Sequence, residues 1–217
     1  MSEKGYWDAR YRAGGTSGMG SIGQLRTWKW MVIRAAMMLH SPELVAPKII
    51  DVGCGDLSFF DTPDAVHPSD YVGIDISEEI ISRHRLPGRL GHSFILGASR
   101  GLIPMIRAPV VLCMDLLFHL MDDDDYRETL KNLCVYSEDL IFIYTWKYNP
   151  LGPRGTDDIY QKYRLLDNDL NVFTEMGFKL IEENSSPDRI GCLYVFKLDA
   201  HHFLYGLKCP ITNLKSH

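Results

Sequence analysis

Short apolar segments alternate with polar, helix-compatible segments from residue 47 onward. The apolar segments are rich in β-branched and aromatic residues and show no regular polar alternation, which is typical of strands buried on both faces of a parallel sheet. The predicted strands are KIIDVG (48–53), YVGIDI (71–76), SFILG (93–97), PVVLCMD (109–115) and DLIFIYTW (139–146). This alternation predicts an α/β fold.

Three helices are predicted, one before residue 47 and two among the polar segments after it. They are QLRTWKWMVIRAAMMLH (24–40), DDDDYRETLKNLCVYS (122–137) and DIYQKYRLLDNDLNVFTEM (158–176). The first has apolar residues at spacings of three and four, namely Leu25, Trp28, Val32, Ala35, Ala36 and Leu39. The second would bury Tyr126, Leu130, Leu133 and Cys134. Its four aspartates favour a helix N-terminus over a metal site, because consecutive helical side chains diverge.

The two ends of the chain complete the predicted organisation. GFKLIEEN (177–184) and RIGCLYVFKL (189–198) resemble two strands joined by a turn, so the sheet is expected to end in an antiparallel hairpin. Residues 199–217 show no clear period and form a predicted tail. The N-terminal GYWDARYR is followed by AGGTSGMGSIG, which is either a ligand-shaped loop between two helices or a flexible linker.

Composition narrows the classes of protein. The 217 residues fit one domain, and 46% hydrophobic with 24% charged residues are ordinary values for a globular protein. The net charge of -5 disfavours a nucleic acid partner. The scattered cysteines are expected to be reduced and mostly buried, and neither a membrane span nor a metal-ligand pattern is evident. A cytoplasmic location is therefore expected, and no feature indicates an oligomeric state.

The segment KIIDVGCGD carries the main chemical signal. An apolar strand ends in Asp51, and Gly53 and Gly55 allow a sharp turn and a close approach to a ligand beyond the strand. The spacing is DxGxG, which differs from the dinucleotide and P-loop patterns. About twenty residues later, a second strand ends in Asp75, where a carboxylate can accept hydrogen bonds from ribose hydroxyls.

These motifs, in this order and spacing, resemble those of class I S-adenosylmethionine-dependent methyltransferases over residues 47–198. The resemblance implies a Rossmann-like three-layer sandwich whose seven-stranded, mostly parallel sheet has an antiparallel last strand. It implies S-adenosylmethionine as cofactor and S-adenosylhomocysteine as product, with Asp51 at the methionine amino group and Asp75 at the ribose. The other implied cofactor contacts are Gly53, Cys54, Gly55 and Ile76.

The adenine contact is less clear from the resemblance. Many relatives carry an aspartate after the third strand, whereas this chain has LGASRG. The backbone of Gly97 or Ala98, or the Ser99 hydroxyl, could replace it.

Residues 1–46 resemble the N-terminal lid of a narrower group of small-molecule methyltransferases, in which an aromatic segment and a glycine loop cover the cofactor. The implied lid contacts are Tyr6, Trp7, Tyr11, Arg12 and the loop from Gly14 to Gly20, with Arg12 near the cofactor carboxylate. Trp7 and Tyr11 also have helical spacing, so packing against the core is an equal alternative.

Candidate catalytic residues follow the fourth predicted strand in VVLCMDLLFHL. Methyl transfer needs an aligned nucleophile and, for a hydroxyl or ammonium, removal of its proton. His119 is the candidate general base because its ordinary pKa suits proton transfer near neutral pH, although it could instead be a structural histidine. Asp115 would shape the loop or receive the substrate. The acceptor pocket wall could come from Tyr144, Trp146, Lys147 and Tyr148.

The resulting hypothesis is a methyltransferase that acts on an oxygen or nitrogen atom of a small molecule, such as a sugar or a biosynthetic intermediate. The acidic balance, the absence of an NPPY-type motif and the lack of an added recognition domain favour this class. The alternatives are a methyltransferase of RNA or protein, and a non-catalytic cofactor-binding module with the same fold.

Overall fold

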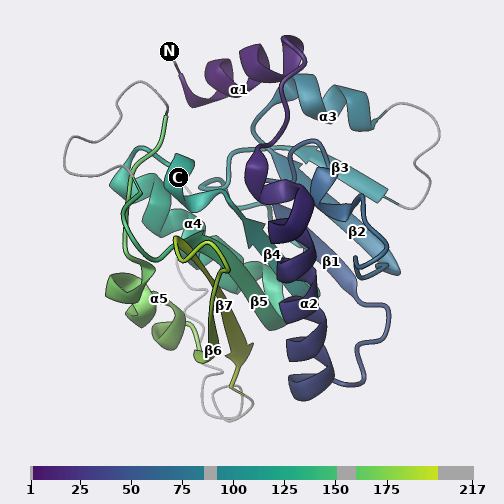
Figure 1. Ribbon diagram of the computed structural model, residues 1–217, viewed down its shortest axis with the longest axis vertical. Helices are drawn as coiled ribbons and strands as arrows, with labels where there is room; N and C mark the ends of the chain where they lie inside the picture. The colour runs from purple at the N-terminus through teal and green to yellow at the C-terminus, as the bar shows by residue number, and fades with distance from the viewer. Residues whose placement is uncertain (1, 86–91, 151–159, 200–217) are drawn as a thin grey trace, which may run out of the picture.

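The computed structural model describes residues 2–85, 92–150 and 160–199, and its centre is a seven-stranded sheet with the order β3-β2-β1-β4-β5-β7-β6 (Figure 1). The strands are β1 (Lys48–Val52), β2 (Asp70–Asp75), β3 (His92–Leu96), β4 (Ala108–Met114), β5 (Ser137–Trp146), β6 (Phe178–Ser185) and β7 (Gly191–Leu198). Every strand predicted from the apolar pattern is present. The predicted tail lies outside the described residues from residue 200 onward.

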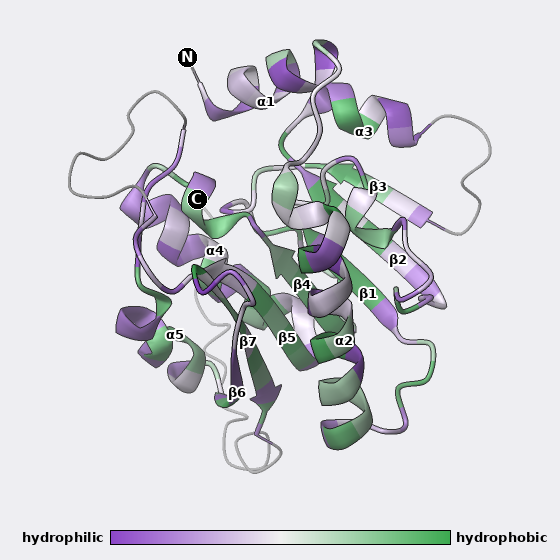
Figure 2. Ribbon diagram, viewed as in Figure 1, coloured by the Kyte–Doolittle hydropathy of each residue, from purple (hydrophilic) through white to green (hydrophobic). Residues whose placement is uncertain are grey.

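The pairing of the strands matches the predicted class. The first five strands pair in parallel, and β7 is antiparallel to both β5 and β6. The C-terminal hairpin is therefore confirmed, as is the mostly parallel sheet with an antiparallel last strand. Figure 2 shows the apolar character of the central strands, as expected because both faces of these strands are buried.

Helices cover both faces of the sheet and give three layers (Figure 1). They are α1 (Glu3–Arg12), α2 (Gly23–His40), α3 (Glu78–His84), α4 (Asp123–Tyr136) and α5 (Leu170–Glu175). Side chains of α2 and α3 join one core cluster, and side chains of α4 and α5 join the other. Within β1, Ile49 belongs to the first cluster and Ile50 to the second, as expected for a strand buried on both sides.

The start of α4 confirms the interpretation of the aspartate run. The Asp122 carboxylate accepts hydrogen bonds from the backbone N–H groups of Asp124 and Asp125 at 2.8 and 3.0 Å. It is therefore a helix cap. The predicted apolar face of this helix is also confirmed, since Tyr126, Leu130, Leu133 and Cys134 are all buried.

The buried face of α2 agrees with the predicted one in part, since Ala36 is buried and Leu25, Trp28 and Val32 pack against the core. Ala35 and Leu39 are exposed, Leu39 at 71%, whereas Lys29, Trp30, Ile33, Ala36 and Met37 are buried. Trp30 determines this orientation, because its ring stacks on Phe59 at 4.6 Å and its indole N–H donates to the Phe59 carbonyl oxygen at 2.7 Å. The helix is thus rotated relative to its most regular apolar stripe.

The helix predicted over residues 158–176 is wrong for its first part. The segment from residue 160 to 165 is not helical, a 3-10 turn covers Leu166–Asp169, and α5 begins only at Leu170. The Lys162 N–H instead donates to the Phe118 carbonyl oxygen at 2.8 Å, and the Arg164 guanidinium donates to the Leu120 carbonyl oxygen at 2.5 Å. These bonds fasten the segment over the connection between β4 and α4.

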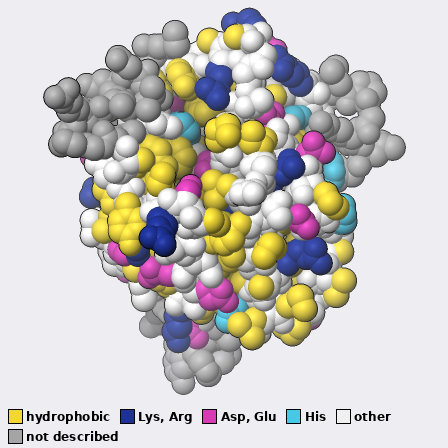
Figure 3. Space-filling view, viewed as in Figure 1, with side chains coloured by type: hydrophobic (Ala, Val, Ile, Leu, Met, Phe, Trp, Pro, Cys, Tyr) yellow, Lys and Arg dark blue, Asp and Glu magenta, His cyan; other side chains and the backbone are white. Residues whose placement is uncertain are grey.

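The remaining sequence expectations concern thiols and the surface. Cys54, Cys113, Cys134 and Cys192 are buried, as expected, and Cys209 lies outside the described residues. In the part of the chain that the structure describes, no helix is long and apolar enough to cross a membrane. On the face shown in Figure 3, basic and acidic side chains are interspersed with hydrophobic ones.

Candidate active site

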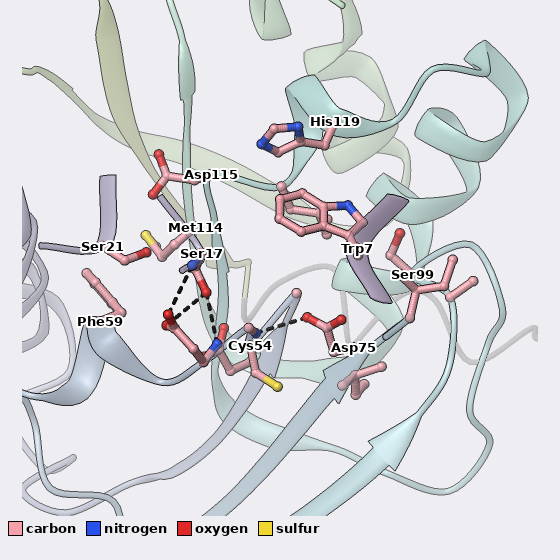
Figure 4. A pocket seen from close by; sticks show the side chains of 18 of the residues that line it. Trp7, Ser17, Ser21, Cys54, Phe59, Asp75, Ser99, Met114, Asp115 and His119 are labelled. Carbon is pink, nitrogen blue, oxygen red and sulfur yellow. Dashed lines mark hydrogen bonds between the residues drawn. The ribbon is translucent and has the colours of Figure 1, made fainter. Parts of the chain in front are cut away.

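A pocket lies beyond the carboxyl ends of β1, β2 and β4 (Figure 4). The chain leaves β1 toward β2 on one side and later returns to place β4 on the other, which is the position where open α/β sheets bind ligands. We call this space the central pocket. The predicted site residues that line it are Asp51, Gly53, Cys54, Gly55, Asp75, Ile76, Gly97, Ala98, Ser99, Tyr11, Asp115 and His119.

The glycine motif after β1 is held directly against the end of β2. The Gly55 N–H donates to Asp75 Oδ2 at 2.9 Å, and the Ser77 N–H donates to Asp75 Oδ1 at 2.8 Å. Gly53 and Gly55 have φ values of 82° and 52°, which favour glycine. A Cβ atom on Gly55 would also lie 2.1 Å from Ser17 Oγ. Both glycines are therefore needed for the loop geometry.

The pocket contains two buried carboxylates. Burial raises the pKa of Asp75 to about 6, although backbone N–H groups act in the opposite direction. Burial also raises the pKa of Asp51 to about 7, while the hydroxyl of Tyr71, which donates to Asp51 Oδ2 at 2.8 Å, lowers it. Within the described residues, neither carboxylate forms an ion pair. The pocket therefore favours a ligand that carries positive charge and hydrogen-bond donors.

The glycine loop before α2 is connected to the motif loop by Ser17 and Asp56. The Ser17 N–H donates to Asp56 Oδ2 at 3.0 Å, the Ser17 hydroxyl donates to Asp56 Oδ1 at 2.8 Å, and the Asp56 N–H donates to Ser17 Oγ at 2.8 Å (Figure 4). Residues 13–18 are therefore fixed to the site rather than forming a free linker. Sequence reasoning missed Ser17 and Asp56, because a serine in a glycine loop carries no distinct signal.

Helix α1 lies across the pocket because it docks on the N-terminus of α3. Asp8 accepts hydrogen bonds from the Ser77 hydroxyl at 2.7 Å and from the Glu79 N–H at 3.1 Å. Burial acts to raise the pKa of Asp8, but hydrogen bonds from Lys4, Ser77 and Glu79 have the larger combined effect and lower the pKa to about 2. Asp8 is therefore ionised at neutral pH and anchors the helix.

Trp7 and Tyr11 of α1 line the central pocket and also pack against the core, so packing does not exclude a place at the pocket. The Trp7 ring meets the His119 ring edge-on at 4.9 Å (Figure 4). The Tyr11 hydroxyl lies 3.2 Å from Ser17 Oγ. Glu3, on the first turn of the same helix, also lines the pocket and was not predicted.

Three predicted lid contacts lie elsewhere. Tyr6 stacks on Tyr160 at 5.0 Å, the Arg12 side chain is 70% exposed and lies 3.7 Å from Glu79, and Gly14 follows the end of α1 outside the lining. Residues four apart share a helical face, which brings Trp7 and Tyr11 together. Tyr6 and Arg12 are each one position away and point in other directions.

Asp115 is paired with a lysine that sequence reasoning missed. The Lys29 side chain is 0% exposed, and its ammonium lies 2.5 Å from Asp115 Oδ2 and 2.9 Å from the Gly20 carbonyl oxygen. It also lies 3.6 Å from the ring centroid of Tyr144. Burial lowers the pKa of Lys29, whereas Asp115 raises it. Asp115 is therefore an ion-pair partner and a poor general base.

His119 has a defined tautomer. Its Nδ1 atom lies 2.9 Å from the Tyr160 carbonyl oxygen, which can only accept, so Nδ1 carries the hydrogen and Nε2 keeps its lone pair. Burial lowers the pKa of His119 below its ordinary value. The imidazole is therefore neutral at pH 7 and can accept a proton at Nε2.

A second space, the outer cleft, adjoins the central pocket. Asp115, His119 and Trp7 line both spaces. The outer cleft is further lined by Tyr6, Met19, Phe118, Tyr144, Trp146, Asp188 and Ile190.

Two of the four predicted acceptor residues therefore line the outer cleft, Tyr144 and Trp146. Lys147 instead pairs with Asp167 at 2.6 Å and Glu183 at 2.7 Å. Tyr148 is 60% exposed and is absent from the lining.

The strand order, the antiparallel β7 and the position of the pocket define the fold of class I S-adenosylmethionine-dependent methyltransferases. No family model matches the chain, and no curated protein matches its sequence. The assignment of the fold therefore depends on the three-dimensional comparison.

Solved structures with this fold include several methyltransferases. Magnesium protoporphyrin IX methyltransferase (ChlM) from Synechocystis PCC 6803 with bound S-adenosylhomocysteine has a TM-score of 0.66 and 15% identity, covering 90% of this chain and 98% of that one. The N-methyltransferase NodS from Bradyrhizobium japonicum WM9 with the same ligand has a TM-score of 0.66 and 14% identity. The match covers 91% of this chain and 99% of that one. A third match is a chain from the Haloferax volcanii complex between the methyltransferase activator Trm112 and its proposed methyltransferase. It has a TM-score of 0.63 and 16% identity, and the match covers 92% of this chain and 99% of that one.

The substitution Asp51→Asn should stabilise the ligand-free protein at neutral pH. In the unfolded chain this carboxyl loses its proton near pH 4, whereas in the folded protein it does so near pH 7. The folded state thus binds more protons between these values, and Asp51 makes stability fall as pH rises from 4 to 7. Urea unfolding should show the variant gaining about 3 to 4 kcal/mol relative to wild type across this range, at about 1.4 kcal/mol for each unit of the shift.

The matched control for this measurement is Asp70→Asn. Asp70 lies at the start of the neighbouring strand β2, where its carboxylate is partly exposed beside Lys48. Its stability difference from wild type should change little with pH. A difference for Asp51→Asn that stayed constant from pH 4 to 7.5 would contradict the raised pKa.

Proposed function

We propose that the protein is an S-adenosylmethionine-dependent methyltransferase that methylates an oxygen or nitrogen atom of a small molecule. The observation that carries this proposal is the pair of buried carboxylates, Asp51 and Asp75, at the ends of adjacent strands in one pocket. The cofactor has an ammonium group and a ribose diol, which supply the positive charge and the donors that these carboxylates lack.

The geometry fits the cofactor along the whole central pocket. Asp75 already accepts one backbone N–H on each oxygen, and each carboxylate oxygen has further acceptor capacity for a ribose hydroxyl. The backbone at Gly53 and Gly55 allows close approach of a ligand. Asp51 would hold the amino group. Ser21, which also lines the pocket, offers a hydroxyl group in place of the Arg12 side chain for the carboxylate end, whereas the Ser17 hydroxyl already donates to Asp56.

The outer cleft is the proposed acceptor site, because it meets the central pocket at Asp115 and His119. The bound cofactor would supply an electrophilic methyl group at this junction. Trp7, Tyr144 and Trp146 provide apolar walls that orient a small acceptor. His119 Nε2 would take the proton from the acceptor, so that its lone pair is free to form the new bond to the methyl carbon.

Further support for a small acceptor comes from the size and the charge of the site. ChlM, which by its name methylates the small molecule magnesium protoporphyrin IX, has the same fold and nearly the same length. Basic side chains do not gather into a patch on the face shown in Figure 3. We also propose that residues 1–46 act as a lid, residues 47–198 as the cofactor-binding core and residues 199–217 as a tail, all within one domain.

A macromolecular acceptor is the second candidate. The similarity to a chain of the Haloferax volcanii Trm112 complex supports it, because that complex joins a methyltransferase activator to a methyltransferase and so forms a larger assembly. The two candidates share the cofactor site and differ in what reaches the outer cleft.

Cofactor binding tests the proposal directly. Isothermal titration calorimetry with S-adenosylhomocysteine should show binding to wild type and a loss of about 100-fold or more for Asp75→Ala, because the variant leaves two ribose hydroxyls and two backbone N–H groups without their acceptor. Asp70→Ala, on the same strand, should bind like wild type. An absence of binding to wild type would refute the proposed function.

The acceptor class can be separated by size. Incubation with S-adenosylmethionine and a fractionated cell extract should yield S-adenosylhomocysteine with the fraction below about 1 kDa, since the outer cleft adjoins the reacting centre and is lined by aromatic walls suited to a small ligand. The protein and RNA fractions serve as comparisons. Turnover confined to a macromolecular fraction would favour the second candidate.

The substitution His119→Gln tests the general base. Glutamine can still donate to the Tyr160 carbonyl oxygen but cannot take a proton, so kcat/KM for the acceptor should fall about 100-fold or more. Wild-type kcat/KM should decline in acid as pH falls through the pKa of His119, which burial lowers from its ordinary value, because only the neutral imidazole is a base. That decline should be absent in the variant. Turnover within twofold of wild type would show that positioning suffices.

A further inference from the structure

The end of the central pocket beyond Asp75 is formed by mostly aliphatic and small residues. Ile76 follows β2, the segment from Gly97 to Ser99 follows β3, and Leu120 approaches from the connection after β4. If Asp75 holds the ribose, as proposed above, this end receives the base. Aliphatic walls suit the faces of a planar purine, so recognition of its edge requires a polar group nearby.

The polar groups of Ser99 are already committed to α4. Thr129 Oγ1 donates to the Asp125 carbonyl oxygen at 2.8 Å, so the hydrogen between Ser99 Oγ and Thr129 Oγ1, 2.9 Å apart, comes from Ser99. The Ser99 carbonyl oxygen accepts from the Asn132 side chain at 2.8 Å. Ser99 is therefore positioned by α4 and is less suited to read the base than its place in the sequence indicated.

A carboxylate reaches this end of the pocket from α1. Glu3 lines the central pocket, and its side chain is 18% exposed. Its polar contact is with Arg100, next to Ser99, at 3.5 Å, whereas the same guanidinium group lies 2.8 Å from Asp125. Burial raises the pKa of Glu3, against the lowering effect of Arg100. The carboxylate of Glu3 thus has acceptor capacity that the described residues do not satisfy.

We propose that Glu3 accepts a hydrogen bond from the exocyclic 6-amino group of the adenine ring and thereby selects an adenine nucleoside. The amino group is a neutral donor at the edge of the purine, and a partly buried carboxylate is its complementary acceptor. This assignment depends on the proposed cofactor. It makes α1 a part of the binding site, because Glu3 lies on the same helix as Trp7 and Tyr11, which also line the central pocket.

A purely structural role for Glu3 would give a different pattern. An acidic residue in the first turn stabilises the helix dipole, and Glu3 also contributes to the charge around Arg100. Either effect would change the affinity for every ligand by the same factor. A direct hydrogen bond instead changes the preference between ligands that differ at the 6-amino group.

The experiment compares two ligands by isothermal titration calorimetry. They are S-adenosylhomocysteine and its 6-deamino analogue, in which purine replaces adenine and the amino group is absent. Wild type should bind S-adenosylhomocysteine about 10- to 100-fold more tightly, which corresponds to a hydrogen bond to a charged group. In Glu3→Ala the two affinities should agree within about threefold, and Glu3→Gln should show an intermediate preference. Circular dichroism verifies that each variant is folded.

Asp125→Asn is the matched control, because it removes the closer partner of Arg100 without touching the pocket lining. It should keep the wild-type preference. If wild type binds S-adenosylhomocysteine but Glu3→Ala retains the full preference for the amino group, the assignment of Glu3 is wrong while the cofactor site stands. If wild type binds neither ligand, the proposed function itself fails.

Discussion

The ammonium group of Lys29 is fully buried, and segments that are distant in the sequence meet around it. It contacts the Gly20 carbonyl oxygen in the glycine loop, Asp115 after β4 and the ring of Tyr144 in β5. A buried charge without these partners would cost several kcal/mol, so the loop, both strand ends and α2 hold one another in a single arrangement. This arrangement brings Asp115 and the start of the outer cleft beside the central pocket.

The folded chain by itself disfavours the ionised form of the two carboxyl groups in the central pocket. Asp51 and Asp75 are buried, and burial raises the pKa of both. Residues of this kind reduce stability and are retained where a ligand supplies the missing partner. The Ser17–Asp56 hydrogen bonds fasten the glycine loop beside the same pocket, and the docking of Asp8 on α3 fastens α1 there.

The central strands β1, β4 and β5 were predictable because a strand buried on both faces leaves a continuous apolar run. The order of the motifs then placed Asp51 and Asp75 together, since the carboxyl ends of adjacent parallel strands share one edge of the sheet. The helix over residues 158–176 failed for the opposite reason. Its local pattern is helical, but the backbone from 160 to 165 makes hydrogen bonds with the connection after β4.

The sequence by itself determined the α/β class, the antiparallel hairpin and the pocket residues that lie within the motifs, because these depend on local spacing and on the ends of strands. Only the tertiary structure decided the contacts made between distant segments. In the sequence, Lys29 is indistinguishable from a polar residue on the surface of a helix, and Glu3 is indistinguishable from an acidic residue that stabilises a first helical turn. What places them at the site is the rotation of α2 set by Trp30 and the docking of α1 through Asp8, and neither is encoded in the residues beside them.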